Sequence, residues 1–148
     1  MEDVTIFLSF VLFPTNQQLA DIAATIYEQG GVVGAVGHGL DHGQTLAIVL
    51  PSTLSIRRDR KWQKLLQYAE RVWNIVDGSE EERVELAIAK TRDFFESVGV
   101  RTRLSNYGVG LDTIPVIVER LEKRGYVALG EHQDINPQTV EKILTLCA

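Results

Sequence analysis

Two histidines four residues apart are the clearest candidates for chemistry in this chain of 148 residues. His38 and His42 stand in the run Gly37-His-Gly-Leu-Asp-His-Gly-Gln44. On a helix, residues four apart share a face, so both imidazoles could bind one divalent metal ion. The spacing alone is a weak signal, because histidines beside glycines also serve as packing or capping residues. Both interpretations stay open at this point.

The charge balance excludes one class of partner. The chain has 15 Lys and Arg against 20 Asp and Glu, which gives a formal net charge of −5. Its densest basic run, residues 57–61, contains Asp59 and is typical of a solvated connector between helices. Because a phosphate-binding surface needs a dense basic face, we expect no nucleic-acid partner.

The apolar run at residues 4–13 bears on localisation. It is too short to cross a bilayer as a helix. Glu2 and Asp3 precede it, whereas a secretory signal carries positive charge at that place. The only cysteine is Cys147, so an intramolecular disulfide and a Cys-x-x-Cys metal knuckle are both excluded. We therefore expect a cytoplasmic protein with no membrane segment.

Apolar residues recur at spacings of three and four from residue 16 onward, which is typical of amphipathic helices. The spacing predicts helices over residues 16–29, 40–56, 60–76, 79–98, 112–124 and 136–147. This pattern indicates an all-α fold, a helical bundle in a single domain. Trp62 and Trp73 fall on one helical face, where we expect them in the core, whereas His132 lies in a polar loop and is expected at the surface.

The boundary between the helices 60–76 and 79–98 has a chemical signature. Asp77-Gly78 is expected to end the first helix, because glycine accepts the left-handed conformation of helix ends, and Val76 is then its last inward residue. Ser79 and Glu82 have the spacing of a capping box, which starts the second helix. The inward stripe of that helix is expected to reach Val98.

Prolines and a cap mark other helices. Pro51 lies inside the predicted helix 40–56 and is expected to kink it. Pro115 falls in the first turn of the helix 112–124, where a missing amide costs little. Asn136 before Pro137 is the pattern of an N-cap followed by a proline at the first helical position.

Residues 1–36 are the exception to this regular pattern. Val, Thr, Ile and Phe at 4–13 favour a strand that Pro14 ends, and a helix docked on the core is the alternative. A lone strand has an unpaired edge, which could pair with the same strand of a second copy. We therefore expect a homodimer, with residues 1–36 packed on the domain formed by residues 37–148.

The sequence from residue 37 to 147 resembles a known family. The His-Gly-Leu-Asp-His run is followed by Gln44-Thr-Leu-Ala-Ile-Val-Leu-Pro51, and together they are similar to the metal-binding motif of the iron-type (group III) alcohol dehydrogenases. The closer likeness is to their bacterial NADP-dependent aldehyde reductase branch, often called butanol-dehydrogenase-like. The likeness continues through residues 64–75, 91–96, 104–108 and 129–131.

The resemblance implies a helical half of an enzyme. In that family an α/β half binds the nicotinamide cofactor, and a helical half holds a divalent metal with one aspartate and three histidines. The metal polarises the substrate carbonyl for hydride addition. By position, His42 matches the last of these ligands, and His38 matches a histidine near the site that is not a standard ligand.

The departures from the family pattern matter as much as the match. No Gly-x-Gly-x-x-Gly turn follows a strand, so the cofactor-binding half has no counterpart here. The aspartate and the first histidine of the ligand set also have none. The remaining ligand position is Glu28, and Val32 replaces a histidine near the substrate. The metal candidates are therefore His42 and, more weakly, His38 and Glu28, with iron or zinc as the ion.

Two functions are consistent with these residues. In the first, part of a dehydrogenase gene has gained a new amino-terminal segment, and the product binds no cofactor, lacks redox activity alone and serves as a binding or interaction protein. In the second, the chain takes part in metal-dependent, NADP-linked alcohol or aldehyde oxidoreduction, either as an oligomer or beside a separate cofactor-binding chain. The small number of metal ligands favours the first.

Overall fold

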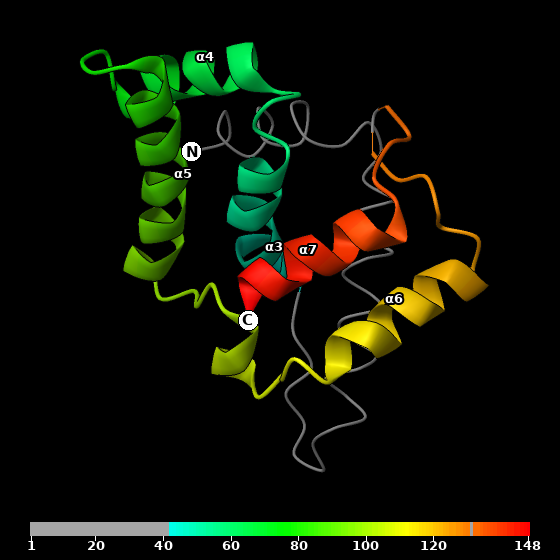
Figure 1. The fold of residues 1–148 in the computed structure, drawn as a ribbon. Coiled ribbons are helices and arrows are strands. Elements are labelled where there is room, and N and C mark those ends of the chain that lie inside the picture. The colour runs from blue at the N-terminus through cyan, green and yellow to red at the C-terminus, as the bar shows by residue number, and fades with distance from the viewer. Residues whose placement is uncertain (1–41, 131) are drawn as a thin grey trace.

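The computed structural model describes residues 42–130 and 132–148, which form five α-helices and one short 3₁₀ helix (Figure 1). The helices are α3 (His42–Ile56), α4 (Trp62–Trp73), α5 (Glu80–Ser97), α6 (Thr113–Lys123) and α7 (Pro137–Cys147), and the 3₁₀ helix is η1 (Leu104–Tyr107). The described residues contain no strand beyond one isolated antiparallel bridge, between Leu129 and Ile135. The predicted all-α fold is thereby confirmed. The strand expected at 4–13, the helix at 16–29 and the packing of residues 1–36 lie outside the described residues.

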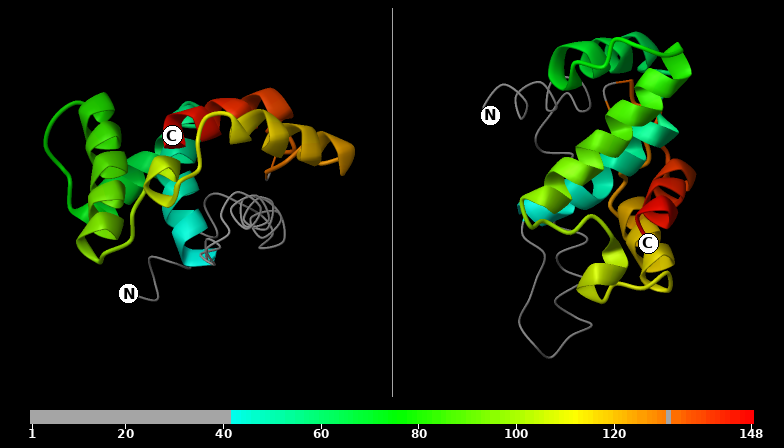
Figure 2. Two further views of the ribbon diagram at one scale, coloured as in Figure 1. Left: turned by 90° about the horizontal axis from the view of Figure 1, so that it is seen from below. Right: turned by 90° about the vertical axis from the view of Figure 1, so that its left-hand side faces the viewer.

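Helix α3 lies between α5 on one side and α7 on the other (Figures 1 and 2). It contributes to two hydrophobic clusters. Its residues Ile48 and Val49 join the first cluster, and Leu50 and Leu54 join the second. Almost every position from Thr45 to Leu54 is buried, as expected of a helix covered on more than one side. Its interior Pro51 is buried as well and lies in the helix as predicted.

The first cluster, called core A here, joins α3 to the later part of the chain. It is built from aliphatic side chains of α3, η1, α6, the loop after α6, and α7, where the sole cysteine also packs. Its buried members are Ile48, Val49, Leu104, Val109, Ile114, Ile117, Leu121, Leu129, Ile135, Val140, Ile143, Leu144 and Cys147.

The second cluster, core B, joins α3 to α4 and α5. Its buried members are Leu50, Leu54, Leu65, Leu66, Tyr68, Ala69, Ile75, Val84, Ala87 and Ile88. Trp62 and Trp73 pack on it partly buried, so their predicted place in the core is confirmed. Core B is the aromatic side of the molecule, because the Tyr68 and Trp73 rings meet edge to face and Trp73 lies beside Phe94.

Core B also encloses one polar contact. The Thr91 hydroxyl donates to the Ala87 carbonyl at 2.8 Å, which leaves its oxygen free to accept from the Tyr68 hydroxyl at 2.6 Å. Both side chains are almost fully buried. Burial raises the pKa of Tyr68, so this phenol stays protonated and works as a donor that joins α4 to α5.

The predicted caps are present. The Ser79 hydroxyl accepts from the Glu82 amide at 3.2 Å, and the Glu82 carboxylate accepts from the Ser79 amide at 2.8 Å. Asn136 caps α7 by accepting from the Thr139 amide at 2.9 Å, with Pro137 at the first helical position. Each helix start is therefore specified by its own local sequence.

Two predictions at the end of α4 are wrong. The helix ends at Trp73 and not at Val76, because Asn74 takes the left-handed conformation with φ 54°. Asparagine tolerates this conformation better than other non-glycine residues and can end a helix as glycine does. Val76 is consequently 56% exposed in the loop that follows, where Gly78 forms a turn.

The inward stripe of α5 also ends earlier than predicted. Val98 follows the last helical residue and is 58% exposed. Gly99 has a left-handed φ of 84°, and its amide donates to the Glu96 carbonyl at 3.0 Å, so the helix ends here and Val98 lies beyond its inward stripe. Gly99 itself closes the helix, because glycine accepts this left-handed conformation.

Candidate metal site

The strongest sequence candidate, His42, is the first residue of α3. Its side chain, and the whole of His38 and Glu28, lie outside the described part of the structure. The structure does describe the backbone of His42 and the helix that follows it. From Thr45 onward α3 is buried by both cores, so the backbone at its start is held by a rigid element, as a metal-binding or catalytic side chain requires.

The remaining potential ligands are scattered. Among residues 42–130 and 132–148, no group of three or more His, Cys, Asp and Glu side chains is placed to hold a metal ion. A zinc-type or iron-type centre needs three or four protein ligands. The described residues by themselves therefore supply no complete metal centre, and the side chains of the candidates His42, His38 and Glu28 lie outside them. We derive no chemical step through a metal.

Cys147 is a packing residue in this arrangement. It is fully buried in core A, and its thiol donates to the carbonyl oxygens of Ile143 at 3.1 Å and Ile48 at 3.4 Å. Burial raises the pKa of this thiol, which keeps it neutral. A neutral, enclosed thiol is neither a nucleophile nor a metal ligand.

The structure reveals one charged centre that the sequence did not indicate. Arg57 donates to the Asp134 carboxylate, and the Arg60 guanidinium lies 3.8 Å from the same oxygen. The Arg57 and Asp134 side chains are only 14% and 27% exposed. The hydrogen bond from Arg57 holds the pKa of Asp134 below its usual value. The sequence predicts a solvated connector at residues 57–61, but the Arg57 side chain is mostly buried and pairs with Asp134.

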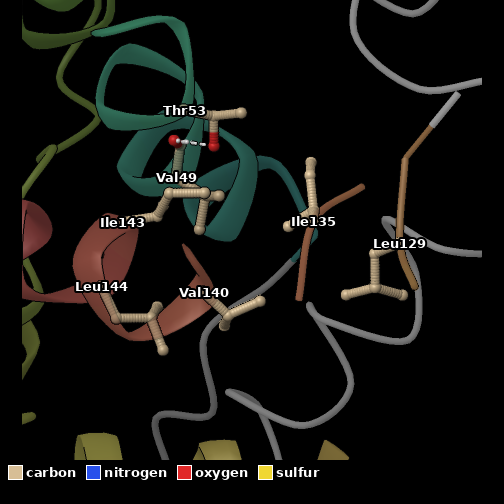
Figure 3. A pocket seen from close by; sticks show the side chains of 7 residues that line it. All are labelled: Val49, Thr53, Leu129, Ile135, Val140, Ile143 and Leu144. Atoms are coloured by element: carbon tan, nitrogen blue, oxygen red, sulfur yellow. Dashed lines mark hydrogen bonds between the residues drawn. The ribbon is translucent and has the colours of Figure 1, made fainter. Parts of the chain in front are cut away.

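This charged centre adjoins an apolar hollow between α3 and α7 (Figure 3). Seven residues line the hollow: Val49, Thr53, Leu129, Ile135, Val140, Ile143 and Leu144. It has room for about one water molecule and no polar surface to hold one. Thr53 and Ile135 also line a second hollow, together with Arg57, Lys61, Gly130, His132 and Asp134. His132 is exposed there, as predicted.

Comparison with known proteins shows to which family the chain belongs. The C-terminal domain model of the Fe-containing alcohol dehydrogenase family matches residues 31–147. The chain belongs to this family. The resemblance of the His-Gly-Leu-Asp-His motif and the segments after it is thereby confirmed.

The relatives point to the same branch of the dehydrogenase family. The NADPH-dependent aldehyde reductase YqhD of Escherichia coli is 55% identical over 106 residues, which are 72% of this chain and 27% of YqhD. The NADP-dependent alcohol dehydrogenase 3 of Entamoeba histolytica is 34% identical over 120 residues, 77% of this chain and 29% of that protein. The chain thus spans less than a third of the length of these relatives.

Solved structures agree on the fold of this dehydrogenase domain. The substrate-free and cofactor-free form of E. coli YqhD has a TM-score of 0.79 at 45% identity and covers 88% of this chain and 32% of the YqhD chain. The NADH-dependent butanol dehydrogenase A of Thermotoga maritima has a TM-score of 0.73 at 20% identity and covers 88% of this chain and 32% of that protein. The five helices described above therefore have the arrangement of the C-terminal domain of this family.

Proposed function

We propose that this chain is a helical domain of the iron alcohol dehydrogenase type that lacks redox activity on its own and acts as a binding or interaction protein. One observation carries the proposal: around the two cores, the described residues, which do not include the side chain of His42, bring no three metal ligands together. The sequence adds that Glu28 stands where the family has a ligand histidine. A buried free thiol also suits the reducing cytoplasm, which we propose as its compartment.

A second function is favoured by the relatives. Identity of 55% to an NADPH-dependent aldehyde reductase is high, and His42 keeps a position that carries a metal ligand in the family. In this alternative, the chain supports metal-dependent, NADP-linked aldehyde reduction when a separate chain provides the cofactor-binding half. Iron and zinc are the candidate metals.

Metal content and activity separate the two functions. We would purify the full chain without a metal-affinity tag, alone and mixed with a separately expressed α/β half of YqhD, and measure bound metal and NADPH oxidation with a short-chain aldehyde. Our proposal expects less than stoichiometric metal, no reduction in either sample, and no difference between wild type and His42→Ala. Stoichiometric metal that is lost in His42→Ala, with turnover in the mixture, would establish the alternative.

The proposed homodimer needs a separate measurement. Light scattering after size-exclusion chromatography should give twice the chain mass of 16.5 kDa over the micromolar range. A second chain that lacks residues 1–13 should elute as a monomer if the apolar run 4–13 forms the contact. A monomeric full-length chain at all concentrations would refute this part of the proposal.

A further inference from the structure

The connection between α6 and α7 folds back on itself above the apolar hollow. Leu129 and Ile135 exchange two backbone hydrogen bonds, at 2.9 and 3.0 Å, and Gln133 donates its amide to the Gly130 carbonyl at 3.1 Å. Gly130 has a φ of 86°, and a Cβ there would lie 3.0 Å from Cδ1 of Ile135. The base of this loop is therefore narrow and closely packed.

The loop presents an apolar face and a charged side. The side chains of Leu129 and Ile135 face the hollow together with Val140 of α7 and Val49 of α3 (Figure 3). The neighbouring Asp134 pairs with Arg57 at the end of α3. Asp134 directly precedes Ile135, whose side chain lines the hollow. A movement that releases Asp134 from Arg57 therefore also moves a residue in the wall of the hollow.

The ion pair adds a directed polar contact to a loop whose Leu129 and Ile135 side chains are buried in core A. An isolated two-bond bridge is weak by itself. Arg57 and Asp134 are partly buried, so solvent and salt screen their attraction less than that of an exposed pair. Arg58 and Glu85 give the comparison: they too form a hydrogen-bonded ion pair, which joins the turn after α3 to α5, but their side chains are 47% and 55% exposed.

We infer that the Arg57–Asp134 ion pair is a latch that holds the Leu129–Ile135 bridge closed against core A. When the latch is released, the bridge opens by itself while the helices remain folded, and the apolar wall formed by Val140, Ile143 and Leu144 becomes accessible. The latch joins residues 77 positions apart, so it couples the end of α3 to the entry of α7.

Hydrogen exchange at single amides tests the latch in the full chain. The amides of Leu129 and Ile135 report opening of the bridge, and amides inside α5 report global unfolding. We expect Asp134→Asn to accelerate exchange at both bridge amides roughly fivefold and to leave the α5 amides within about twofold of wild type. Raising the salt concentration should accelerate the same two amides in wild type and have little effect in the variant.

Glu85→Gln in α5 is the matched control, because it removes the exposed ion pair of Arg58, the residue next to Arg57. It should leave exchange at Leu129 and Ile135 unchanged. Equal acceleration of the bridge and the α5 amides in Asp134→Asn would overturn the latch, because the ion pair would then act on the whole fold. Unchanged bridge amides in that variant would overturn it as well.

Discussion

The two cores on either side of α3 are stabilised in different ways. Core B connects helices that follow one another in the chain, and its polar contacts span short distances in sequence, as in the Ser79–Glu82 box and the Tyr68–Thr91 pair. Core A joins α3 to residues about a hundred positions later, through aliphatic packing, the Cys147 thiol and the Arg57–Asp134 pair. The comparison indicates that core B is specified locally, whereas core A depends on closing a long stretch of chain.

The largest expected effects come from truncating one leucine in each core. Leu65→Ala in core B and Leu121→Ala in core A each remove a fully buried side chain, which should cost about 3 kcal/mol of unfolding free energy. Both tryptophans pack on core B, so their fluorescence reports that core alone, whereas circular dichroism reports all helices. Because α3 belongs to both cores, we expect the two signals to coincide during denaturation in each variant.

The two leucine variants test whether core A and core B unfold together. Leu86→Ala, which changes a 46% exposed leucine on α5, serves as control and should stay within about 0.5 kcal/mol of wild type. If Leu121→Ala lowers the stability seen by circular dichroism but leaves the tryptophan transition in place, the cores unfold separately. The single cooperative domain would then be refuted.

A smaller effect is expected from the buried hydroxyl pair of core B. Tyr68→Phe removes the donor to Thr91, whose own hydrogen bond to Ala87 remains. Loss of the buried hydroxyl and its bond to Thr91 should reduce the unfolding free energy by about 1 kcal/mol, measured by urea denaturation. Tyr107→Phe is the matched control, because its hydroxyl donates to the Arg101 carbonyl at an exposed site, and it should have less effect. Equal losses in both variants would show that burial does not strengthen the pair.

The difference between the cores also explains what the sequence could predict. The capping box at Ser79, the N-cap at Asn136 and the apolar stripes are local patterns, and each was found where its chemistry places it. The predicted end of α4 at Asp77-Gly78 is wrong because Asn74 takes the left-handed conformation of a helix end before the chain reaches the glycine. His42, the metal candidate of the sequence, is the first residue of α3, and its role as a metal ligand stays a prediction.

The charged centre could not be found in this way. Arg57 and Asp134 are 77 residues apart, and each lies in a segment whose local composition indicates a solvated turn or loop. Only the fold brings α3 and the loop before α7 together. Arginine and aspartate are usually solvated at the surface, but here they are partly buried and paired with each other. Neither helical periodicity nor a capping rule predicts such a contact between distant segments.

The smallest expected effect is a pH dependence located in that centre. The pKa of Asp134 is held below its usual value by the hydrogen bond from Arg57, and the unfolded chain has the ordinary aspartate pKa of about 3.9. Because the folded state binds the proton less readily, the pair stabilises the fold fully above about pH 4 to 5 and loses this contribution as the pH falls through the lowered pKa. The difference in unfolding free energy between wild type and Asp134→Asn should therefore be constant near neutral pH and shrink below about pH 4. Urea denaturation of both proteins between pH 7 and pH 3 measures it, and a difference that grows toward low pH would show that Asp134 acts through some contact other than its charge.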